Sequence, residues 1–209
     1  KGIKINWKCA PEILGEGETT PQETELCFPN GILDFLNYQV GAKATINRRP
    51  FAGEADLDND EGKVEWAITW PEDENGFCHS YCNTVITPFG GTHETGFKSA
   101  LLKGLKEYGE MTNNKKASSI TAEDFLSDAS IMLSLFIRDP QFQGQTKDKL
   151  TSSKATRLVE SAVKDSFDHW LSSDLENAAA LMEYVIERAD ARKKKKEEKE
   201  KVRKTPTKR

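Results

Sequence analysis

The sequence has little cysteine and no long apolar run. Only four of its 209 residues are cysteine and three are histidine. Four cysteines are too few to stabilise a chain of this length, so we expect free thiols and a reducing compartment. No apolar segment approaches the ~18 residues that a membrane span needs, which excludes a transmembrane protein. No charged-then-apolar leader stands at the start, so we expect no signal peptide.

The sequence also lacks the phosphate-binding motifs of common nucleotide enzymes. It contains no GxxxxGK[ST], and GEGETT (15–20) has no third glycine for a dinucleotide fingerprint. The histidines His79, His93 and His169 have no Ser, Cys or Asp partner at a recognisable catalytic spacing. We therefore expect no complete catalytic site in this chain.

Two further segments suggest metal sites but fail on spacing. DLDNDEG (56–62) has Glu61 and Ala67 where a calcium loop needs its glycine and its bidentate glutamate. Cys78 and Cys82 of CHSYC lie four residues apart on an expected strand, about 13 Å at ~3.3 Å per residue, which is too far for one zinc ion. We expect an acidic hairpin loop, two small core cysteines and no metal site.

Charge is distributed unevenly along the chain. Residues 192–209 hold eleven Lys and Arg against three Glu, a net charge of +8, whereas the other 191 residues carry 19 basic and 31 acidic side chains, a net charge of −12. An acidic body is not typical of a domain that coats nucleic acid. The basic tail is either a solvated charged helix or a segment that contacts phosphate.

Hydrophobic periodicity predicts one α+β domain with a helical extension. The expected strands are 3–9, 24–28, 50–58, 63–70, 76–87 and 131–137, and the expected helices start at Asn30-Gly31, at an N-cap on Thr92, at Thr121, at 151 (to 172) and at a Ser173-x-x-Glu176 capping box. The last helix loses its apolar stripe after Ala191 and continues as RKKKKEEKEK. We place one domain at 1–172, the long helix at 173–204 and a linker at 205–209.

Two polar segments are suited to binding a ligand. GGTHETGFK (90–98) places paired glycines at a helix start, where free N–H groups can meet an anion; a well-capped strand-to-helix turn is the alternative. DPQFQGQTK (139–147) carries Gln145 and Lys147 in a loop after a buried strand. A lysine ammonium suits a terminal phosphate, and a glutamine amide can donate to a phosphate oxygen or orient a water. An ordinary exposed loop is the alternative for this segment.

Together these segments resemble the transducer domain of the B subunits of bacterial type IIA DNA topoisomerases. GGTHETGFKSAL (90–101), DPQFQGQTKDKL (139–150) and HSYCNT (79–84) carry the resemblance, which is most specific over residues 76–204. Within the family, FIRDPQFQGQTKDKL, WPEDENGFCHSYCNT and RLVESAVKDSFDHWL resemble the topoisomerase IV branch more than the gyrase branch, which is the alternative.

The resemblance implies a fold like the second domain of ribosomal protein S5, with a left-handed βαβ crossover and a long C-terminal helical extension. In that family the transducer follows an ATP-binding domain, which holds ATP, Mg²⁺ and the glutamate base, and precedes a metal-binding TOPRIM domain. We therefore expect a piece of a longer enzyme that senses ATP and couples its hydrolysis to DNA strand passage. The expected outcome is decatenation and relaxation, or negative supercoiling in the gyrase alternative. This piece alone is expected to hold neither cofactor and to be inactive.

The same resemblance implies roles for three residues. Lys147 is expected to reach the γ-phosphate of ATP with Gln145 beside it, and Lys98 falls where the family places a basic residue facing the cavity for the transported duplex. Lysine makes a weaker phosphate contact than arginine there. His93 receives only a role in the turn. The implied partners are the topoisomerase IV A subunit, a second B subunit in an A2B2 assembly and double-stranded DNA, with no membrane, in the bacterial cytoplasm at the nucleoid.

Two interpretations from other classes remain. An RNA- or ribosome-associated protein with an S5-like fold and a basic tail would bind nucleic acid tightly, and the acidic body argues against it. A small-molecule kinase of related fold is disfavoured because the chain has no Gly-rich phosphate loop.

Overall fold

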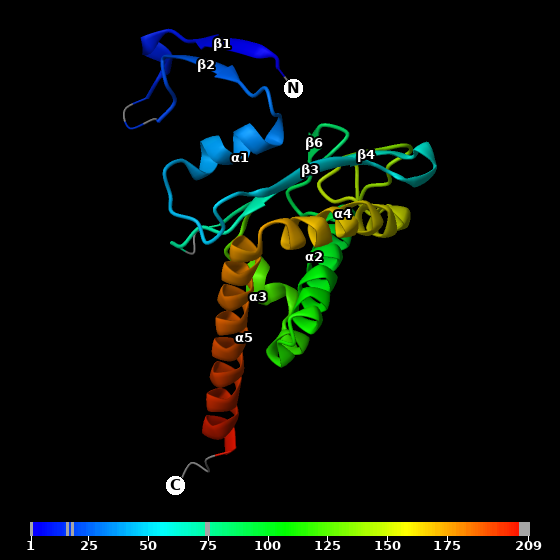
Figure 1. Cartoon of the computed structure of the whole chain (residues 1–209). Helices are drawn as coiled ribbons and strands as arrows, with labels where there is room; N and C mark the ends of the chain where they lie inside the picture. The colour runs from blue at the N-terminus through cyan, green and yellow to red at the C-terminus, as the bar shows by residue number, and fades with distance from the viewer. Residues whose placement is uncertain (1, 16, 18, 74–75, 205–209) are drawn as a thin grey trace.

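The chain forms a five-stranded mixed sheet covered by helices, and a separate two-stranded sheet near its N-terminus (Figure 1). The computed structural model describes residues 2–15, 17, 19–73 and 76–204, with side chains as far as residue 200. The strands are β1 (Lys4–Lys8), β2 (Glu23–Cys27), β3 (Phe51–Asp56), β4 (Gly62–Thr69), β5 (Cys78–Cys82), β6 (Val85–Ile86) and β7 (Ser130–Ile137). The helices are α1 (Ile32–Val40), α2 (Thr92–Met111), α3 (Ala122–Leu126), α4 (Ser153–Ser173) and α5 (Leu175–Lys204), with short 3-10 turns η1 (Pro11–Ile13), η2 (Asp58–Asp60) and η3 (Lys115–Ser119). The predicted α+β class is confirmed, and the predicted linker 205–209 lies outside the described residues.

The five strands are ordered β3-β4-β7-β5-β6. β7 pairs antiparallel with β4 and parallel with β5, so it is the central strand. This position explains its nearly continuous apolar sequence, SIMLSLFI, because a central strand is covered on both faces. Parallel pairing of β5 with β7 requires a crossover, which α2 and α3 supply. The handedness of that crossover stays a prediction.

Helices cover both faces of this sheet. Leu36 of α1 packs in one cluster with Ala67 and Met132. Their chain neighbours Trp66 and Leu133 belong to the larger core that includes α2 and α4. Side chains alternate between the faces of a strand, so β4 and β7 serve both layers at once.

Small residues on α2 let it lie close to α4. A Cβ added at Gly96 would stand 2.3 Å from the backbone oxygen of Thr156, and one at Gly104 would stand 2.6 Å from the Phe167 ring. Gly96, Ala100 and Gly104 recur at four-residue spacing and therefore share one face of the helix. The two helices under the sheet thus form one tightly packed layer.

The long helix α5 has two different halves. Its first half buries apolar side chains from Ala178 to Ala189 in the core, whereas every side chain from Lys193 to residue 200 is exposed. The predicted end of the apolar stripe after Ala191 is confirmed. In Figure 1 the second half projects away from the sheet, opposite the β1–β2 hairpin. No helix in the described part of the chain is long and apolar enough to cross a membrane.

Two predictions about the 76–87 strand are wrong. The segment is a hairpin of β5 and β6, because Asn83 and Thr84 take positive φ angles of 48° and 69° and reverse the chain as a two-residue turn. Cys82 is buried as expected, but Cys78 is exposed, because it begins β5 at a point that the short strand β6 does not cover. All four cysteines are free thiols.

Two predicted helix caps are also wrong. The N-cap of α2 is Gly91, with φ of 146°, and Thr92 is the first helical residue. α5 is capped by Asp174, whose Oδ1 accepts a hydrogen bond from the Asn177 amide at 3.1 Å, and not by Ser173. The predicted start at Thr121 is confirmed, since its capping box with Asp124 is present.

Candidate functional site

A short hairpin-like loop after β7 carries two of the predicted site residues. Phe142 and Leu150 form an isolated antiparallel bridge, and the tip between them exposes Gln145 and Lys147. Lys147 has a φ of 59°, in the left-handed region that residues other than glycine rarely adopt. The loop therefore presents these side chains on a defined turn.

The loop leaves the sheet at a fixed point. The Asn83 side chain accepts a hydrogen bond from the Ile137 amide at 2.9 Å and donates one to the Ile137 carbonyl at 3.0 Å. Asp139, with φ of 51°, and Pro140 then turn the chain out of the strand. Because Asn83 lies in the β5–β6 turn, the neighbouring hairpin holds the last residue of β7.

The other end of the loop is bonded to the glycine turn before α2. The Leu150 amide donates to the Gly90 carbonyl at 3.1 Å, and the Thr92 amide donates to the Leu150 carbonyl at 3.1 Å. A Cβ on Gly91 would lie 2.3 Å from that same Leu150 oxygen, so only glycine permits this approach. The structure thus brings together two polar segments that lie far apart in the sequence.

These contacts leave little room for an anion at the start of α2. The Leu150 carbonyl already accepts from the Thr92 amide. The Glu94 carboxylate also lies beside the turn, since a Cβ on Gly90 would be 2.7 Å from Glu94 Oε2. A carboxylate in the first turn takes the place that a bound anion would use. The strand-to-helix turn is therefore the interpretation that fits this segment.

A series of buried and half-buried hydrogen bonds joins β5 and the segment after β6 to the first two turns of α2. His93 Nε2 lies 3.2 Å from Thr87 Oγ1, which lies 2.6 Å from Ser80 Oγ. Ser80 Oγ donates to Glu94 Oε1 at 2.8 Å, and Lys98 Nζ donates to Glu94 Oε2 at 3.0 Å. Thr87 Oγ1 also donates to the Ser80 carbonyl at 2.9 Å, so the two side chains are bonded to each other through the backbone as well.

Burial and hydrogen bonding determine the charge states of His93 and Glu94. It lowers the pKa of His93 to about 4, so the imidazole is neutral at pH 7. Burial alone would raise the pKa of Glu94, but hydrogen bonds from Ser80 and Lys98 outweigh it and lower that pKa, so Glu94 is ionised. His93 Nδ1 is buried and has no partner among the described residues. At the turn before α2, His93 is thus a buried and neutral side chain.

The two predicted lysines have different surroundings. Lys98, with 40% of its side chain exposed, is paired with Glu94, of which 15% is exposed. Lys147 is exposed, and its Nζ lies 5.9 Å from the centroid of the Phe142 ring. Within the part of the chain that is described, Lys147 has no carboxylate partner and the Gln145 side chain no hydrogen bond. The roles of Lys147, Gln145 and Lys98 stay predictions.

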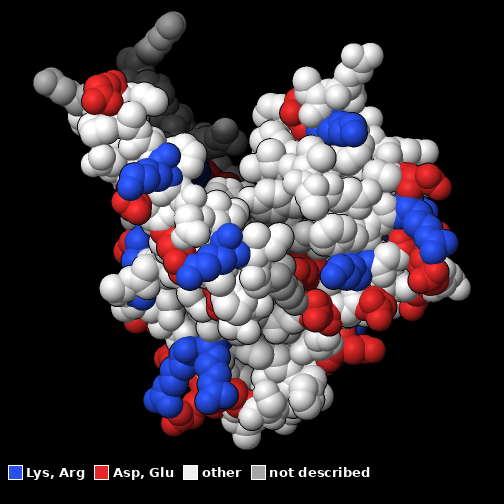
Figure 2. Space-filling view, turned by 90° about the horizontal axis from the view of Figure 1, so that it is seen from above, with Lys and Arg blue, Asp and Glu red and all other residues white. Residues whose placement is uncertain are grey.

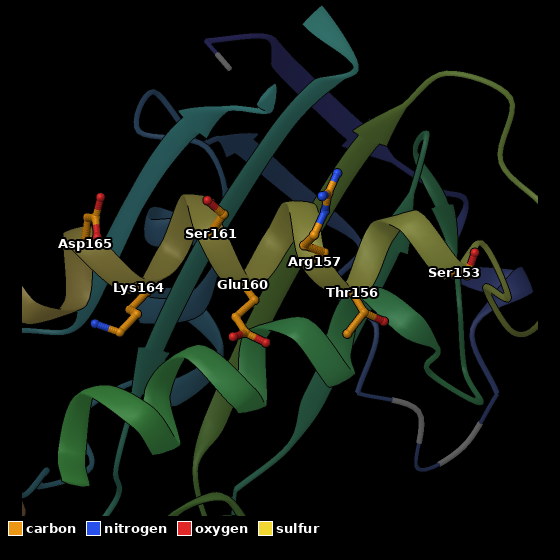
Figure 3. Close-up of a pocket in the computed structure, with 7 residues that line it drawn as sticks. All are labelled: Ser153, Thr156, Arg157, Glu160, Ser161, Lys164 and Asp165. Carbon is orange, nitrogen blue, oxygen red and sulfur yellow. The ribbon is translucent and has the colours of Figure 1, made fainter. Parts of the chain in front are cut away.

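A hollow of about 550 Å³ lies along α4, away from these residues (Figure 3). Its lining is Ser153, Thr156, Arg157, Glu160, Ser161, Lys164 and Asp165. Thr156, Glu160 and Lys164 lie on the side of α4 next to α2. Glu160 pairs with Lys103, and Lys164 pairs with Glu107 at 2.7 Å. These polar groups join the two helices, so the hollow belongs to helix packing.

Charge on the rest of the surface is mixed. Figure 2 shows Lys and Arg lying beside Asp and Glu over the face seen from above. Among the residues that the structure describes, no group of three or more His, Cys, Asp or Glu is placed to hold a metal ion. The residues with the clearest capacity to meet a ligand are therefore at the tip of the loop after β7.

Four residues of this region were not predicted from the sequence. Ser80, Thr87 and Asn83 form side-chain hydrogen bonds between segments, and no local pattern reveals such bonds. Glu94 had a usable signal, because Glu94 and Lys98 stand at the i,i+4 spacing that pairs side chains on a helix.

Comparison with known sequences points to one family. The family profile described as DNA gyrase B matches residues 31–201. The B subunit of DNA topoisomerase 4 from Caulobacter vibrioides is 47% identical over 204 residues, covering 96% of this chain and 29% of that protein. The protein of the same name from Rickettsia felis is 48% identical over 208 residues, covering 99% and 31%. The chain thus spans less than a third of the length of these relatives.

Solved structures show the same fold. The topoisomerase IV ATP-binding domain of Francisella tularensis, in complex with a small-molecule inhibitor, has a TM-score of 0.70 at 28% identity, covering 91% of this chain and 49% of that one. The 43K ATPase domain of Thermus thermophilus gyrase B, in complex with an aminocoumarin, has a TM-score of 0.72 at 24% identity, covering 85% and 48%. The chain therefore corresponds to about half of each of these structures.

Proposed function

The chain belongs to the DNA gyrase B family, and on that basis we propose that it is the ATP-sensing transducer of a topoisomerase IV B subunit. Relatives named as B subunits of DNA topoisomerase 4, at 44–48% identity over nearly the whole chain, support the topoisomerase IV branch. A gyrase transducer that serves negative supercoiling is the alternative. The family assignment favours both over an RNA-associated protein or a small-molecule kinase.

The observation that carries the proposal is the exposure and backbone conformation of Lys147. It stands on an exposed loop tip, is free of any carboxylate in the described chain, and is held in a left-handed backbone. That conformation costs a residue other than glycine about 1–2 kcal/mol. Such strain is concentrated at ligand-binding and switch segments. A free cation presented at this cost is suited to an anionic partner that the rest of the chain does not supply.

The chemistry follows from the two side chains at the tip. The Lys147 ammonium stabilises the negative charge that develops on a terminal phosphate during hydrolysis, and the Gln145 amide donates to a phosphate oxygen or orients the attacking water. ATP with Mg²⁺ supplies the phosphoryl group when bound, and residues outside this chain would hold both. Loss of the γ-phosphate removes the partner of Lys147. The loop then has different affinities for the two nucleotide states, which a switch requires.

The fixed ends of the loop explain how this contact would be transmitted. One end is held at Ile137 by Asn83, and the other is bonded at Leu150 to the turn that begins α2. A displacement of the tip therefore pulls on β7 and α2 together. In the intact protein we expect this movement to drive passage of double-stranded DNA, with the A subunit and a second B subunit, in the cytoplasm at the nucleoid. Lys98 would face the transported duplex.

The assignment includes the domain boundaries. We assign residues 1–172 to an S5-like transducer domain and 173–204 to its helical extension. The crossover from β5 through α2 and α3 to the parallel strand β7 supports that fold, and a left-handed crossover is expected.

The direct test is Lys147→Ala in the full-length subunit assembled with its A subunit. We expect the ATPase kcat to fall about 10²- to 10³-fold, as for loss of one electrostatic contact to a transition state. The Kd for nucleotide should change less than kcat. Lys149→Ala is the matched control, because Lys149 is another exposed lysine of the same loop.

An unchanged rate in Lys147→Ala would show that the loop is only a connector. An equal loss in Lys149→Ala would show that the loop as a whole, and not the Lys147 charge, supports the rate. Lys147→Arg should retain part of the activity, because it keeps the charge and changes its geometry.

A further inference from the structure

Two aspartates connect the segment before β7 to α5: Asp124 lies in α3, and Asp128 lies in the turn that leads into β7. β7 ends in the loop that carries Gln145 and Lys147, the sensing loop (residues 138–150).

We propose that Asp124 and Asp128 are positioning residues that hold α5 on α3 and on the turn leading into β7, through Arg192 and Arg188, so that movement of the loop tip reaches the long helix. This inference rests on the proposed function. It assigns the transmission step to two ion pairs.

β7 joins the two regions directly. Its last residue, Ile137, leads into the sensing loop, and its first, Ser130, follows α3 after three connecting residues. An eight-residue strand at ~3.3 Å per residue is roughly 25 Å long. It is the central strand, bonded on both sides, so it moves as a rigid unit.

α3 is fixed to this sheet and cannot slide on it. The Trp70 indole Nε1 donates to the Phe125 carbonyl at 2.6 Å in the buried core. A Cβ on Gly76 would lie 2.3 Å from the Asp128 carbonyl oxygen, so the backbone after α3 is in close contact with the segment that enters β5. Asp124 and Asp128 therefore move together with the sheet.

Arg192 of α5 forms a two-pronged bond with Asp124. Its Nε donates to Asp124 Oδ1 at 2.7 Å and its Nη2 to Oδ2 at 3.0 Å. Only 2% of the Asp124 side chain is exposed. The Thr121 amide and hydroxyl also donate to Oδ2, at 2.8 and 2.9 Å, so the carboxylate is held rigidly at the start of α3. A bidentate pair of this kind fixes orientation as well as distance.

Arg188, one turn earlier on α5, forms a second ion pair. It is paired with Asp128, and its guanidinium lies over the Tyr184 ring at 5.3 Å from the centroid. Arg188 and Arg192 are four residues apart, as are Asp124 and Asp128. The two pairs therefore form a short antiparallel ladder between α5 and the segment formed by α3 and the turn before β7.

Beyond Ala189, ion pairs and hydrogen bonds position α5. Ala189 is the last buried apolar residue among the described side chains of the helix. α5 is also attached to η3: Lys116 pairs with Asp190 at 2.8 Å, and Lys193 and Arg192 donate to the Ser119 side chain and carbonyl at 2.7 and 3.1 Å. The Lys116–Asp190 pair contacts η3 alone, so it supplies a control on the same turn of the same helix.

The experiment uses the full-length subunit assembled with its A subunit, and measures strand passages per ATP hydrolysed. In Arg188→Gln/Arg192→Gln we expect the ATPase rate to stay at the wild-type value while this ratio falls by about tenfold or more, as for loss of a coupling free energy between two sites. Lys116→Gln should leave the ratio unchanged. Exchange of one pair, Asp128→Arg with Arg188→Asp, should retain more coupling than Arg188→Asp alone.

Three results would overturn the inference. One is an unchanged ratio in the folded double variant, with folding checked by its melting temperature. Another is an equal loss in Lys116→Gln, which would mean that any loosening of α5 has this effect. The third is an ATPase rate that falls in parallel with strand passage. If the wild-type assembly shows no ATP-dependent strand passage at all, the proposed function fails, and that failure is distinct from these three.

Discussion

At the scale of single residues, Lys98 and Lys147 differ in their capacity to bind a phosphate because their neighbours differ. Lys98 is paired with the ionised Glu94, whereas Lys147 contacts an aromatic ring and is otherwise free in the described chain. A paired lysine has part of its charge cancelled before any phosphate approaches. The contact of Lys98 with DNA is therefore expected to be the weaker of the two predicted phosphate contacts.

His93 makes the stability of the fold depend on pH. Its side chain is fully buried, and its pKa is about 4 against an ordinary value of 6.5. Between these values the unfolded chain binds a proton at this residue that the folded chain does not. The contribution of neutral His93 to the free energy of unfolding is therefore fully present above pH 6.5. It is lost as pH falls toward 4, by about 3 kcal/mol in total at ~1.4 kcal/mol per pH unit.

Urea unfolding at several pH values measures this loss. His93→Gln should flatten the dependence between pH 5 and 6.5, a range above the ordinary titration of carboxylates. His169→Gln is the control, because His169 is exposed on α4 and its replacement should leave the slope in place. A slope that persists in His93→Gln would contradict the buried neutral imidazole.

At the scale of elements, the contact between α2 and α4 limits what their residues can be. A Cβ on Gly96 would lie 2.3 Å from the backbone oxygen of Thr156, whereas one on Gly104 would lie 2.6 Å from the ring of Phe167. A ring can rotate away, but a backbone oxygen inside a helix cannot. The two glycines are therefore not equivalent.

Alanine substitutions test this difference. Gly96→Ala should lower the free energy of unfolding by about 1–3 kcal/mol, as overpacking does, even though alanine favours helix by about 1 kcal/mol. Gly104→Ala should cost less, because the Phe167 ring can adjust. Urea unfolding followed by tryptophan fluorescence gives both values. Equal costs at the two positions would contradict the packing described here.

The same scale shows why part of the fold was predictable from sequence. β7 and α4 carry long, regular apolar patterns, and both were predicted within two residues of their ends. The caps at Thr92 and Ser173 were wrong because the identity of a cap depends on which neighbour meets a particular amide. The 76–87 strand was wrong because Asn83 and Thr84 are residues that an extended pattern tolerates but a tight turn uses.

The candidate site was predictable only in part for a related reason. Gln145 and Lys147 were identified by their chemistry and by the family motif, and both are on one exposed tip. The bonds from Leu150 to Gly90 and Thr92 join residues about sixty positions apart, and periodicity carries no information about such pairs. The same holds for Asn83 at the end of β7.

At the scale of the whole molecule, the acidic excess lies in the folded body and the basic residues gather on the projecting half of α5. The sheet and its helices carry the acidic excess, and their cations lie beside acids on the face seen in Figure 2. The exposed lysines Lys193 to Lys196 and Lys199 lie on the projecting half of α5 (Figure 1). Under the proposed function, a nearby duplex would be attracted to α5 and repelled by the acidic body.

The most direct test of nucleotide sensing is hydrogen exchange of the full-length subunit in three states: without nucleotide, with a non-hydrolysable ATP analogue, and with ADP. We predict that backbone amides of residues 143–149 exchange more slowly with the analogue than with ADP, because only the triphosphate supplies a partner for Lys147 at the loop tip. Lys147→Ala should abolish that difference while the analogue remains bound. Equal exchange of this loop with the analogue and with ADP would contradict the proposal that it senses the γ-phosphate.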